Sequence, residues 1–194
     1  MNLVIIIGPS AVGKRTVGLE LAKLTNYTLV HNHQPKDFII DVNGEFDVEL
    51  LREVRKTVVK YYAENQVQGL ILSFRYNYMS SGSMFHLRDL IEIVTEADSQ
   101  SSVYIVELVS PLEIRLDRNI SDDRQELKYV KTVEEMEGNE SSGVYSYDEL
   151  DSHFNIIKDV LNVDNMYIMR IDNSNMGAVD VAELIHKKIY DTEK

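Results

Sequence analysis

Five short, mostly apolar runs spaced far apart along the chain constrain its fold more than any other feature. The runs are rich in β-branched residues, which is typical of strands buried on both faces of a parallel sheet. The segments between consecutive runs are long enough to hold crossover helices, which parallel strands require. The sequence therefore predicts an α/β fold with five parallel strands, at residues 3–7, 27–30, 70–74, 103–109 and 166–171.

Apolar residues recur at spacings of three and four in several of the segments between or after these runs. This period predicts amphipathic helices, and the last of them should pack its apolar stripe on the sheet. The stripes are Val17, Leu21 and Leu24; Leu50, Leu51, Val54, Val58 and Tyr61; Leu87, Leu90, Ile91 and Val94; and Val179, Ala182, Ile185 and Ile189.

Residues 111–162 interrupt the alternation of strands and helices. Residues 112–118 and 149–161 have helical patterns, but no strand-like run lies between them. Residues 134–146 are rich in glutamate, glycine and serine, so we expect a mobile surface segment there. We interpret residues 1–194 as one domain with a core of residues 1–110 and 163–194. In this interpretation residues 111–162 form either a lid over a ligand or a loose loop.

Composition excludes several classes of function. The chain has 194 residues, 44% of them hydrophobic, which is enough for one buried core. Its formal net charge of −12 would repel nucleic acid, and the lack of cysteine excludes disulfides, thiolate metal sites and a cysteine nucleophile. The run at residues 3–7 is too short for a signal peptide or a membrane span. We therefore expect a cytoplasmic monomer or homodimer without a nucleic-acid or membrane partner.

A glycine-containing segment separates the first apolar run from the first helical pattern. Gly8 permits a sharp departure from the strand, and Gly13 lets backbone N–H groups approach phosphate oxygens. The following helix adds the positive end of its dipole, and Lys14 can reach the outer phosphates. A plain turn with a surface lysine is the alternative, but strand, loop and helix all agree with a phosphate-binding loop (P-loop). The expected nucleotide-binding residues of this segment are Gly8, Ser10, Ala11, Val12, Gly13, Lys14, Arg15 and Thr16.

Two features depart from the usual form of such a loop. Arg15 follows the lysine, where a serine or threonine normally offers its hydroxyl to Mg²⁺. The third apolar run, 70–74, also ends without an aspartate. We infer that nucleotide phosphates and water hold most of the Mg²⁺, that Thr16 serves an inner phosphate, and that Asp37 orients metal-bound water or accepts a hydroxyl proton. A solvated turn acid is the alternative for Asp37, and the more favoured one for Asp41.

Together these residues resemble the P-loop kinases with the adenylate-kinase and shikimate-kinase type of fold, and in particular a bacterial shikimate kinase-like (AAA-type ATPase) branch. The resemblance implies a three-layer fold with a parallel sheet of strand order 2-3-1-4-5 flanked by helices. It also implies nucleotide on the loop, an acceptor substrate over the ends of the second and third strands, and a helical lid. The carboxylate-binding pattern of true shikimate kinases is absent, so we do not predict shikimate. The similar segments are residues 14–18, 31–33, 52–55, 107–118 and 171–175.

Three arginines lie on or just beyond a predicted helix of the segment 111–162, namely Arg115, Arg118 and Arg124. A transferring phosphoryl group spreads negative charge over its oxygens, so such cations can neutralise it when a lid closes. We expect Arg124 to act on phosphate and Arg115 or Arg118 to bind the nucleotide, with surface ion pairs as the alternative. Asn173 and Ser174 resemble a segment that packs against adenine, and a generic turn is the alternative there.

His31 and His33 are two apart at a strand end, so both should point to one side of the sheet edge where α/β proteins bind ligands. We favour contact with the acceptor over a metal site, and ordinary hydrogen-bonded histidines are a third interpretation. Arg55 belongs to a basic stripe opposite the apolar face of its helix and could hold an anionic group of the acceptor. Arg75, after the third run, is a further acceptor-binding candidate. Glu107, inside an apolar run, needs a buried partner that the sequence does not identify.

The sequence therefore predicts an ATP-dependent kinase, with Mg²⁺ as cofactor, that transfers the γ-phosphoryl group to a hydroxyl or phosphate of a small polar acceptor. The predicted catalytic residues are Lys14, Asp37 and Arg124, and Asp37 is also the metal candidate. The alternative is an ATP-binding sensor or regulator without an acceptor. Residues 41–44 match a GTPase switch pattern, but no guanine-reading segment accompanies them, so a GTPase is a minor alternative.

Overall fold

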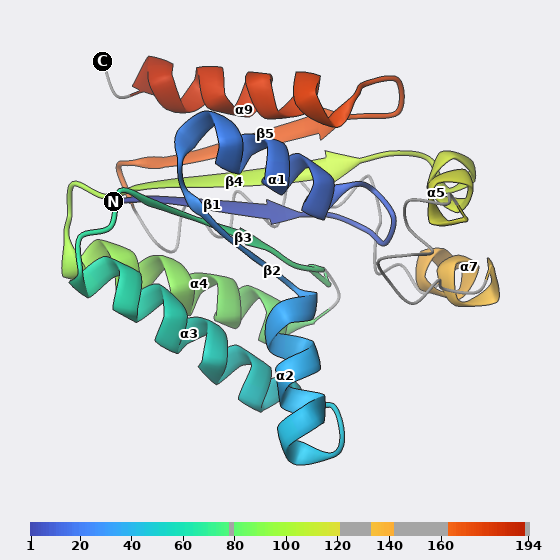
Figure 1. Cartoon of the computed structure of the whole chain (residues 1–194), viewed down its shortest axis with the longest axis horizontal. Coiled ribbons are helices and arrows are strands. Elements are labelled where there is room, and N and C mark those ends of the chain that lie inside the picture. Colours follow the sequence, from blue (N-terminus) through green and yellow to red (C-terminus); the bar gives the residue numbers. More distant parts are fainter. Residues whose placement is uncertain (78–79, 121–132, 142–162, 193–194) are drawn as a thin grey trace.

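The computed structural model of the chain describes residues 1–77, 80–120, 133–141 and 163–192 (Figure 1). Its centre is a sheet with the strand order β2-β3-β1-β4-β5, and all neighbouring strands are parallel. This confirms the order implied by the resemblance. The strands are β1 (Asn2–Ile7), β2 (Thr28–His31), β3 (Gly69–Ser73), β4 (Ser102–Val109) and β5 (Met166–Asp172).

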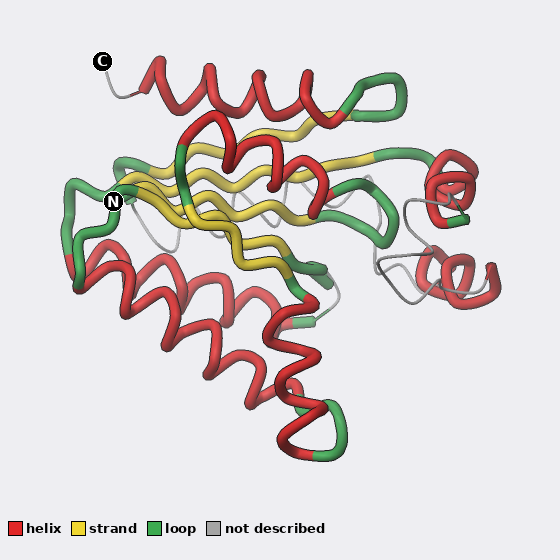
Figure 2. The backbone as a smooth tube through the Cα atoms, viewed as in Figure 1, coloured by secondary structure: helices red, strands yellow, loops and turns green. Residues whose placement is uncertain are grey.

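Helices cover both faces of the sheet (Figures 1 and 2). On one face lie α1 (Lys14–Thr25) and α9 (Ala178–Thr192), and on the other lie α3 (Val48–Glu64) and α4 (Ser81–Ala97). Alternate residues of β1 point to opposite faces, as the pleat of a strand requires. Val4 and Ile6 therefore pack with the α1 and α9 side chains, while Leu3, Ile5 and Ile7 pack with those of α3 and α4. Each fully buried side chain of this size contributes about 1.5–3 kcal/mol to folding.

The remaining helices lie at the carboxyl ends of the strands. α2 (His33–Asn43) continues from β2, α5 (Leu112–Asn119) follows β4, and α7 (Val133–Ser141) packs beside α5 (Figure 1). In the described part of the segment 134–146, for which we expected a mobile surface segment, α7 forms and Met136 is buried. The helix expected at 149–161 lies outside the described residues.

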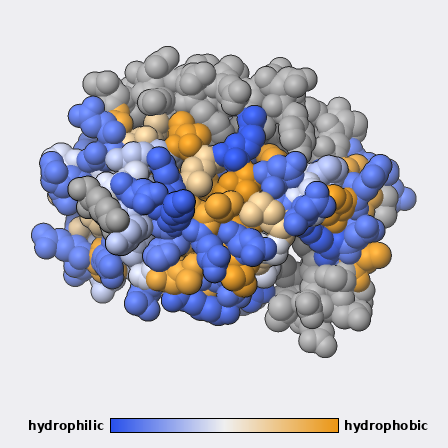
Figure 3. Space-filling view, turned by 90° about the horizontal axis from the view of Figure 1, so that it is seen from above, coloured by the Kyte–Doolittle hydropathy of each residue, from blue (hydrophilic) through white to orange (hydrophobic). Residues whose placement is uncertain are grey.

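The helical period predicted α1, α3, α4 and α9 but not α2, and the buried lines are shifted along some of the predicted helices. Leu24, Leu50, Tyr61 and Val179 are exposed rather than buried. Figure 3 views the face formed by α1 and α9, where apolar side chains lie among hydrophilic ones. Part of the described chain's apolar surface therefore stays in water, as is normal for a folded protein. The buried line of α3 is Leu51, Arg55, Val59 and Ala63.

The placement of Arg55 corrects the prediction of a basic stripe opposite the apolar face of this helix. Arg55 lies in the buried line itself, one turn from Leu51 and one from Val59. Within the described ranges, no helix is long and apolar enough to cross a membrane.

Candidate functional site

The loop between β1 and α1 has the backbone shape that a phosphate-binding loop requires. Gly8, Ala11 and Gly13 have positive φ angles of 142°, 62° and 99°. A Cβ at Gly8 would overlap the carbonyl oxygen of Leu108 on the neighbouring strand. No described side chain caps the N-terminus of α1, and its first turn carries no acidic residue. The exposed N–H groups and the helix dipole therefore favour an anion at this point.

Lys14 is folded back over the loop. Its Nζ donates hydrogen bonds to the carbonyl oxygens of Gly8 at 2.8 Å and Pro9 at 2.6 Å. An ammonium group with three donors can exchange such carbonyl partners for phosphate oxygens without leaving the loop. The arrangement places the lysine charge where the outer phosphates of a bound nucleotide are expected.

Two residues from distant parts of the chain donate hydrogen bonds to backbone carbonyl oxygens of the loop. The buried Arg115 of α5 donates to the carbonyl oxygens of Ser110 at 2.9 Å and Ser10 at 3.4 Å. The amide Nδ2 of Asn173, after β5, donates to the carbonyl oxygen of Val12 at 2.7 Å. These hydrogen bonds tie the loop to the segments that follow β4 and β5.

Arg118 joins the same region. Its guanidinium donates to Oδ1 of Asn173 at 3.2 Å and to the backbone oxygens of Asn173 at 2.7 Å and Ser174 at 3.3 Å. The structure thus brings together Arg118, Asn173 and Ser174, three of the residues predicted to bind nucleotide, next to the P-loop. Asp172 accepts hydrogen bonds from the hydroxyl and the N–H of Ser174, and these bonds lower the pKa of the Asp172 carboxyl.

The described residues around the loop do not fit a Mg²⁺ ion held by the protein. Arg15 occupies the hydroxyl position, Thr16 is exposed, and β3 leads into Phe74 and Arg75 without a carboxylate. Asp37 is exposed on α2. In the described part of the chain, no three His, Asp or Glu side chains are grouped to hold a metal. As far as the described residues go, a magnesium ion at this loop would be held by the phosphates of the nucleotide and by water.

Glu107, whose partner the sequence did not identify, is paired within the sheet. It lies on β4 beside Ile7 of β1, and its carboxylate accepts a hydrogen bond from Nε of Arg170 on β5 at 2.9 Å. The carboxylate side chain is only 2% exposed, so this ion pair balances a charge that could not otherwise be buried. Arg124, the predicted lid cation, lies outside the described residues.

The predicted acceptor-binding residues lie at the ends of β2 and β3. His31 ends β2 and His33 begins α2, so the two do not share a strand end as predicted, because a helix that the sequence analysis did not predict begins at His33. Their rings are nevertheless neighbours, with centroids 6.2 Å apart. Arg75 is exposed just beyond β3.

Arg55 is a buried cation at the same edge. Its guanidinium donates to Oδ1 of Asn32 and lies over the ring of Phe74, 4.8 Å from its centroid. Burial, with a smaller contribution from the charge of Arg52, lowers the pKa of Arg55 to about 10. The group is therefore still charged at neutral pH, and an anion placed beside it would be strongly attracted.

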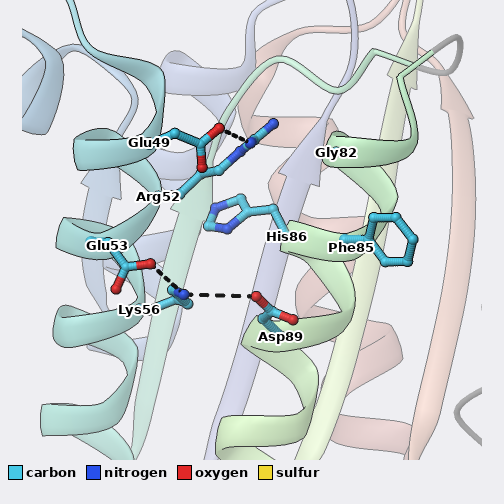
Figure 4. Close-up of a pocket in the computed structure, with 8 residues that line it drawn as sticks. All are labelled: Glu49, Arg52, Glu53, Lys56, Gly82, Phe85, His86 and Asp89. Carbon is cyan, nitrogen blue, oxygen red and sulfur yellow. Dashed lines mark hydrogen bonds and ion pairs between the residues drawn. The ribbon is translucent and has the colours of Figure 1, made fainter.

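A pocket of about 200 Å³ opens between α3 and α4 on the side away from the sheet (Figure 4). His86 points into it between the two helices and is 5% exposed, and neither ring nitrogen has a hydrogen-bond partner among the described residues. Arg52 pairs with Glu49 across the upper end, and Lys56 lies between Glu53 and Asp89. Sequence reasoning missed His86 because it is one polar residue beside the apolar stripe of α4.

The lowered pKa of the buried His86 ring predicts that the stability of the fold depends on pH. Burial, then the charges of Arg55, Arg52 and Lys56, lower its pKa from 6.5 to about 3. Between these values the unfolded chain binds one proton more than the folded chain, so stability falls as the pH falls. From pH 7 to pH 5 this group should remove about 2 kcal/mol from the free energy of unfolding.

Urea unfolding of His86→Phe at both pH values tests this expectation. The variant should lose about 2 kcal/mol less than the wild type between pH 7 and pH 5. His186→Phe, on α9 at the other face of the sheet, is the matched control and should keep the wild-type dependence. An unchanged dependence in His86→Phe would show that His86 is not held neutral.

A five-stranded parallel sheet of this order, with a glycine-containing loop leading from its central strand into a helix, defines the fold class of the P-loop kinases. Several solved structures of other proteins have a similar fold. A candidate kinase from Chloroflexus aurantiacus is similar with a TM-score of 0.58 at 14% identity, covering 98% of this chain and 96% of that one. The tunicamycin resistance protein of Deinococcus radiodurans has a TM-score of 0.56 at 16% identity, with 97% and 95% covered. Shikimate kinase from Acinetobacter baumannii, in complex with shikimate, has a TM-score of 0.51 at 20% identity, with 98% and 93% covered.

No protein-family model matches the sequence, and no curated protein is significantly similar to it. At identities this low, the solved structures show the fold, and the activity has to be argued from the site. The chain therefore has the P-loop kinase fold, while the finer resemblance to a shikimate kinase-like branch stays a prediction.

Proposed function

We propose that this protein is an ATP-dependent phosphotransferase that moves the γ-phosphoryl group to a hydroxyl or phosphate of a small polar acceptor. The observation that carries the proposal is the loop after β1, where glycine conformations, the uncapped start of α1 and the Lys14 ammonium converge on one anion position. Phosphoryl transfer depends mostly on positioning and charge stabilisation, which this arrangement supplies.

The nucleotide-binding residues have separate roles in this proposal. Lys14 exchanges its carbonyl partners for the outer phosphates, and Thr16 serves an inner phosphate. Arg118, with Asn173 and Ser174, lies beside the loop and binds the nucleotide. Arg124 adds charge to the transferring group. Mg²⁺ enters only as an ion that ATP carries, and no step depends on it.

The acceptor would bind over β2 and β3, near His31, His33, Arg55 and Arg75. The buried charge of Arg55 favours an acceptor that carries an anionic group. In the transfer step an acceptor oxygen attacks the γ-phosphorus, and the bond from that phosphorus to the β–γ bridging oxygen breaks. ADP leaves with the bond electrons, and Asp37 accepts the hydroxyl proton.

ADP release with a panel of acceptors tests the proposal. Nucleosides, nucleotides, sugars, hydroxy acids and hydroxylated antibiotics should be compared with a blank that contains ATP alone. We expect stimulation by one class, strongest for members with a carboxylate or phosphate. Failure of ATP to bind, measured by calorimetry and thermal shift, would overturn the proposal.

A second candidate is an ATP sensor without an acceptor. The observation in its favour is the end of β3, where the described residues offer no carboxylate for catalysis. Binding of ATP without turnover against every acceptor would support the sensor, whereas acceptor-stimulated ADP release would exclude it.

A further inference from the structure

The pocket between α3 and α4 contains a buried histidine whose ring lacks polar partners. His86 points into the pocket, and both of its ring nitrogens are buried without a hydrogen-bond partner among the described residues (Figure 4). The ring neighbours that of Phe74, with centroids 5.9 Å apart, and a phenyl ring offers no polar atom. A buried donor and a buried acceptor without partners are costly. A ligand with polar atoms in the pocket would remove this cost.

The charge around His86 favours an anion over a metal ion. Burial has the largest effect in lowering the pKa of its ring, followed by the charges of three cations, namely Arg55, Arg52 and Lys56. The guanidinium of Arg52 reaches the first turn of α4, where a Cβ added at Gly82 would lie 2.6 Å from Nη2. The same cations would repel a metal ion. Among the described residues, no three His, Asp or Glu side chains are grouped to hold one.

Three carboxylates also border the pocket, but they leave the histidine ring free for a ligand. They are the exposed Glu49 and Glu53 on α3 and the half-buried Asp89 on α4. They pair with Arg52 or Lys56, and none of them bonds to a ring nitrogen of His86. Ion pairs near the surface contribute little to stability, so these carboxylates can turn to water when another anion approaches the two cations.

We propose that this pocket binds a phosphate group, with His86 and Arg52 as hydrogen-bond donors and Lys56 as a further cation beside it. Charged donors form the stronger hydrogen bonds to phosphate oxygens. The volume of about 200 Å³ is several times the roughly 30 Å³ that one water occupies, so a small group attached to the phosphate also fits. The pocket is lined by α3 and α4, whereas the P-loop leads into α1. The proposal therefore goes beyond the proposed function and does not depend on it.

Binding at this site should take up a proton. An anion beside the ring favours the imidazolium form and so raises the pKa of His86 towards its ordinary value of about 6.5. Sulfate keeps its charge between pH 7 and pH 5 and should therefore bind about tenfold or more tightly at pH 5. His86→Gln keeps an N–H donor but cannot take up this proton, so it should retain part of the affinity at pH 7 and lose the increase. Titration of the three carboxylates is common to both proteins and cancels in the comparison.

NMR titration of the full chain with sodium sulfate tests the proposal, because it reports on the two anion sites separately. The backbone amide of Gly82 reports on this pocket, and that of Gly13 reports on the P-loop. We expect the Gly82 signal to shift to saturation, and Arg52→Gln to weaken this binding about tenfold or more, the loss expected for one charge-assisted contact. Arg88→Gln is the matched control on α4, because Arg88 pairs with Glu92 on its own helix and does not line the pocket. This control should bind sulfate as the wild type does.

The same titration with inorganic phosphate and with glycerol phosphate, both at pH 7, identifies the source of the phosphate group. Tighter binding of the ester indicates a small phosphorylated metabolite, and tighter binding of the ion indicates free phosphate. Thermal unfolding confirms that each variant is folded. A Gly82 signal that does not shift, or that shifts equally with sodium chloride at the same ionic strength, would overturn the proposal. An increase in affinity at pH 5 that persists in His86→Gln would overturn the role of His86, whatever the Gly13 signal shows for the P-loop.

Discussion

Replacement of Lys14 by alanine should reduce the affinity for ATP by about a hundredfold or more, because in the proposed complex the lysine exchanges its two carbonyl partners for charge-assisted contacts to phosphate oxygens. Each such contact contributes about 1.5–3 kcal/mol, and the lysine is the only side chain of the loop segment 8–14 that carries a charge. Turnover should fall further than affinity, since the same ammonium stabilises charge that develops on the transferring group. Isothermal titration gives the affinity, and ADP release at saturating ATP gives the turnover.

Lys23→Ala is the control for Lys14→Ala. Lys23 is on the same helix, and its side chain is 68% exposed. Among the described residues it pairs only with the neighbouring Glu20, in a surface ion pair of small energetic value. We expect this variant to bind ATP as the wild type does. Unchanged ATP affinity in Lys14→Ala would show that the phosphates bind elsewhere on the molecule.

The sheet could be predicted almost completely from the sequence, for a physical reason. Strands buried on both faces need continuous apolar runs, and β1, β3 and β4 are buried in this way. The edge strands β2 and β5 are only partly buried, yet they also follow such runs within a residue or two. The loop after β1 was equally accessible, because all its parts are adjacent in the chain. Local pattern and local chemistry agree there, and nothing distant has to be known.

Contacts between segments that are distant in the sequence could not be predicted in the same way. Arg55 was expected on an exposed face, yet it is stabilised in the buried line by the amide of Asn32 and the ring of Phe74. Neither residue signals this role by its own sequence position. The burial of His86 is likewise set by how α3 and α4 pack, and this burial, followed by the charges of three nearby cations, lowers the pKa of its ring.

The candidate site shows the same division between local and distant information. Asn173 was expected beside adenine through a resemblance, and the structure adds a hydrogen bond to Val12, 161 positions earlier in the chain. Arg115 was expected to bind nucleotide, and its guanidinium in fact contacts the carbonyl side of the loop. Both observations connect the loop to the ends of β4 and β5. The shape of the anion site therefore depends on contacts between segments whose proximity cannot be read from the periodicity of the sequence.

Substitution of Gly8 by alanine should destabilise the fold by about 3 kcal/mol or more. A φ of 142° is a conformation that residues with a side chain rarely adopt, and forcing it costs on the order of 1–3 kcal/mol. The added Cβ would also overlap the backbone carbonyl of Leu108 and lie 3.1 Å from Cγ1 of Val12. Backbone atoms of a central strand cannot yield as a flexible side chain can, so β4 or the loop itself would have to shift.

Gly44→Ala separates these two causes. Gly44 ends α2 with a φ of 80°, and nothing described lies within 4 Å of the position of an added Cβ. This variant should therefore lose only the conformational part, about 1 kcal/mol. Urea unfolding measures both losses, and titration with ATP measures the shape of the loop. Equal losses in the two variants would contradict the close packing of Gly8 against β4. A larger loss in Gly8→Ala together with weakened ATP binding would mean that the contact between β1 and β4 also sets the geometry of the anion site, because the residue that clashes with the strand is the first residue of the loop.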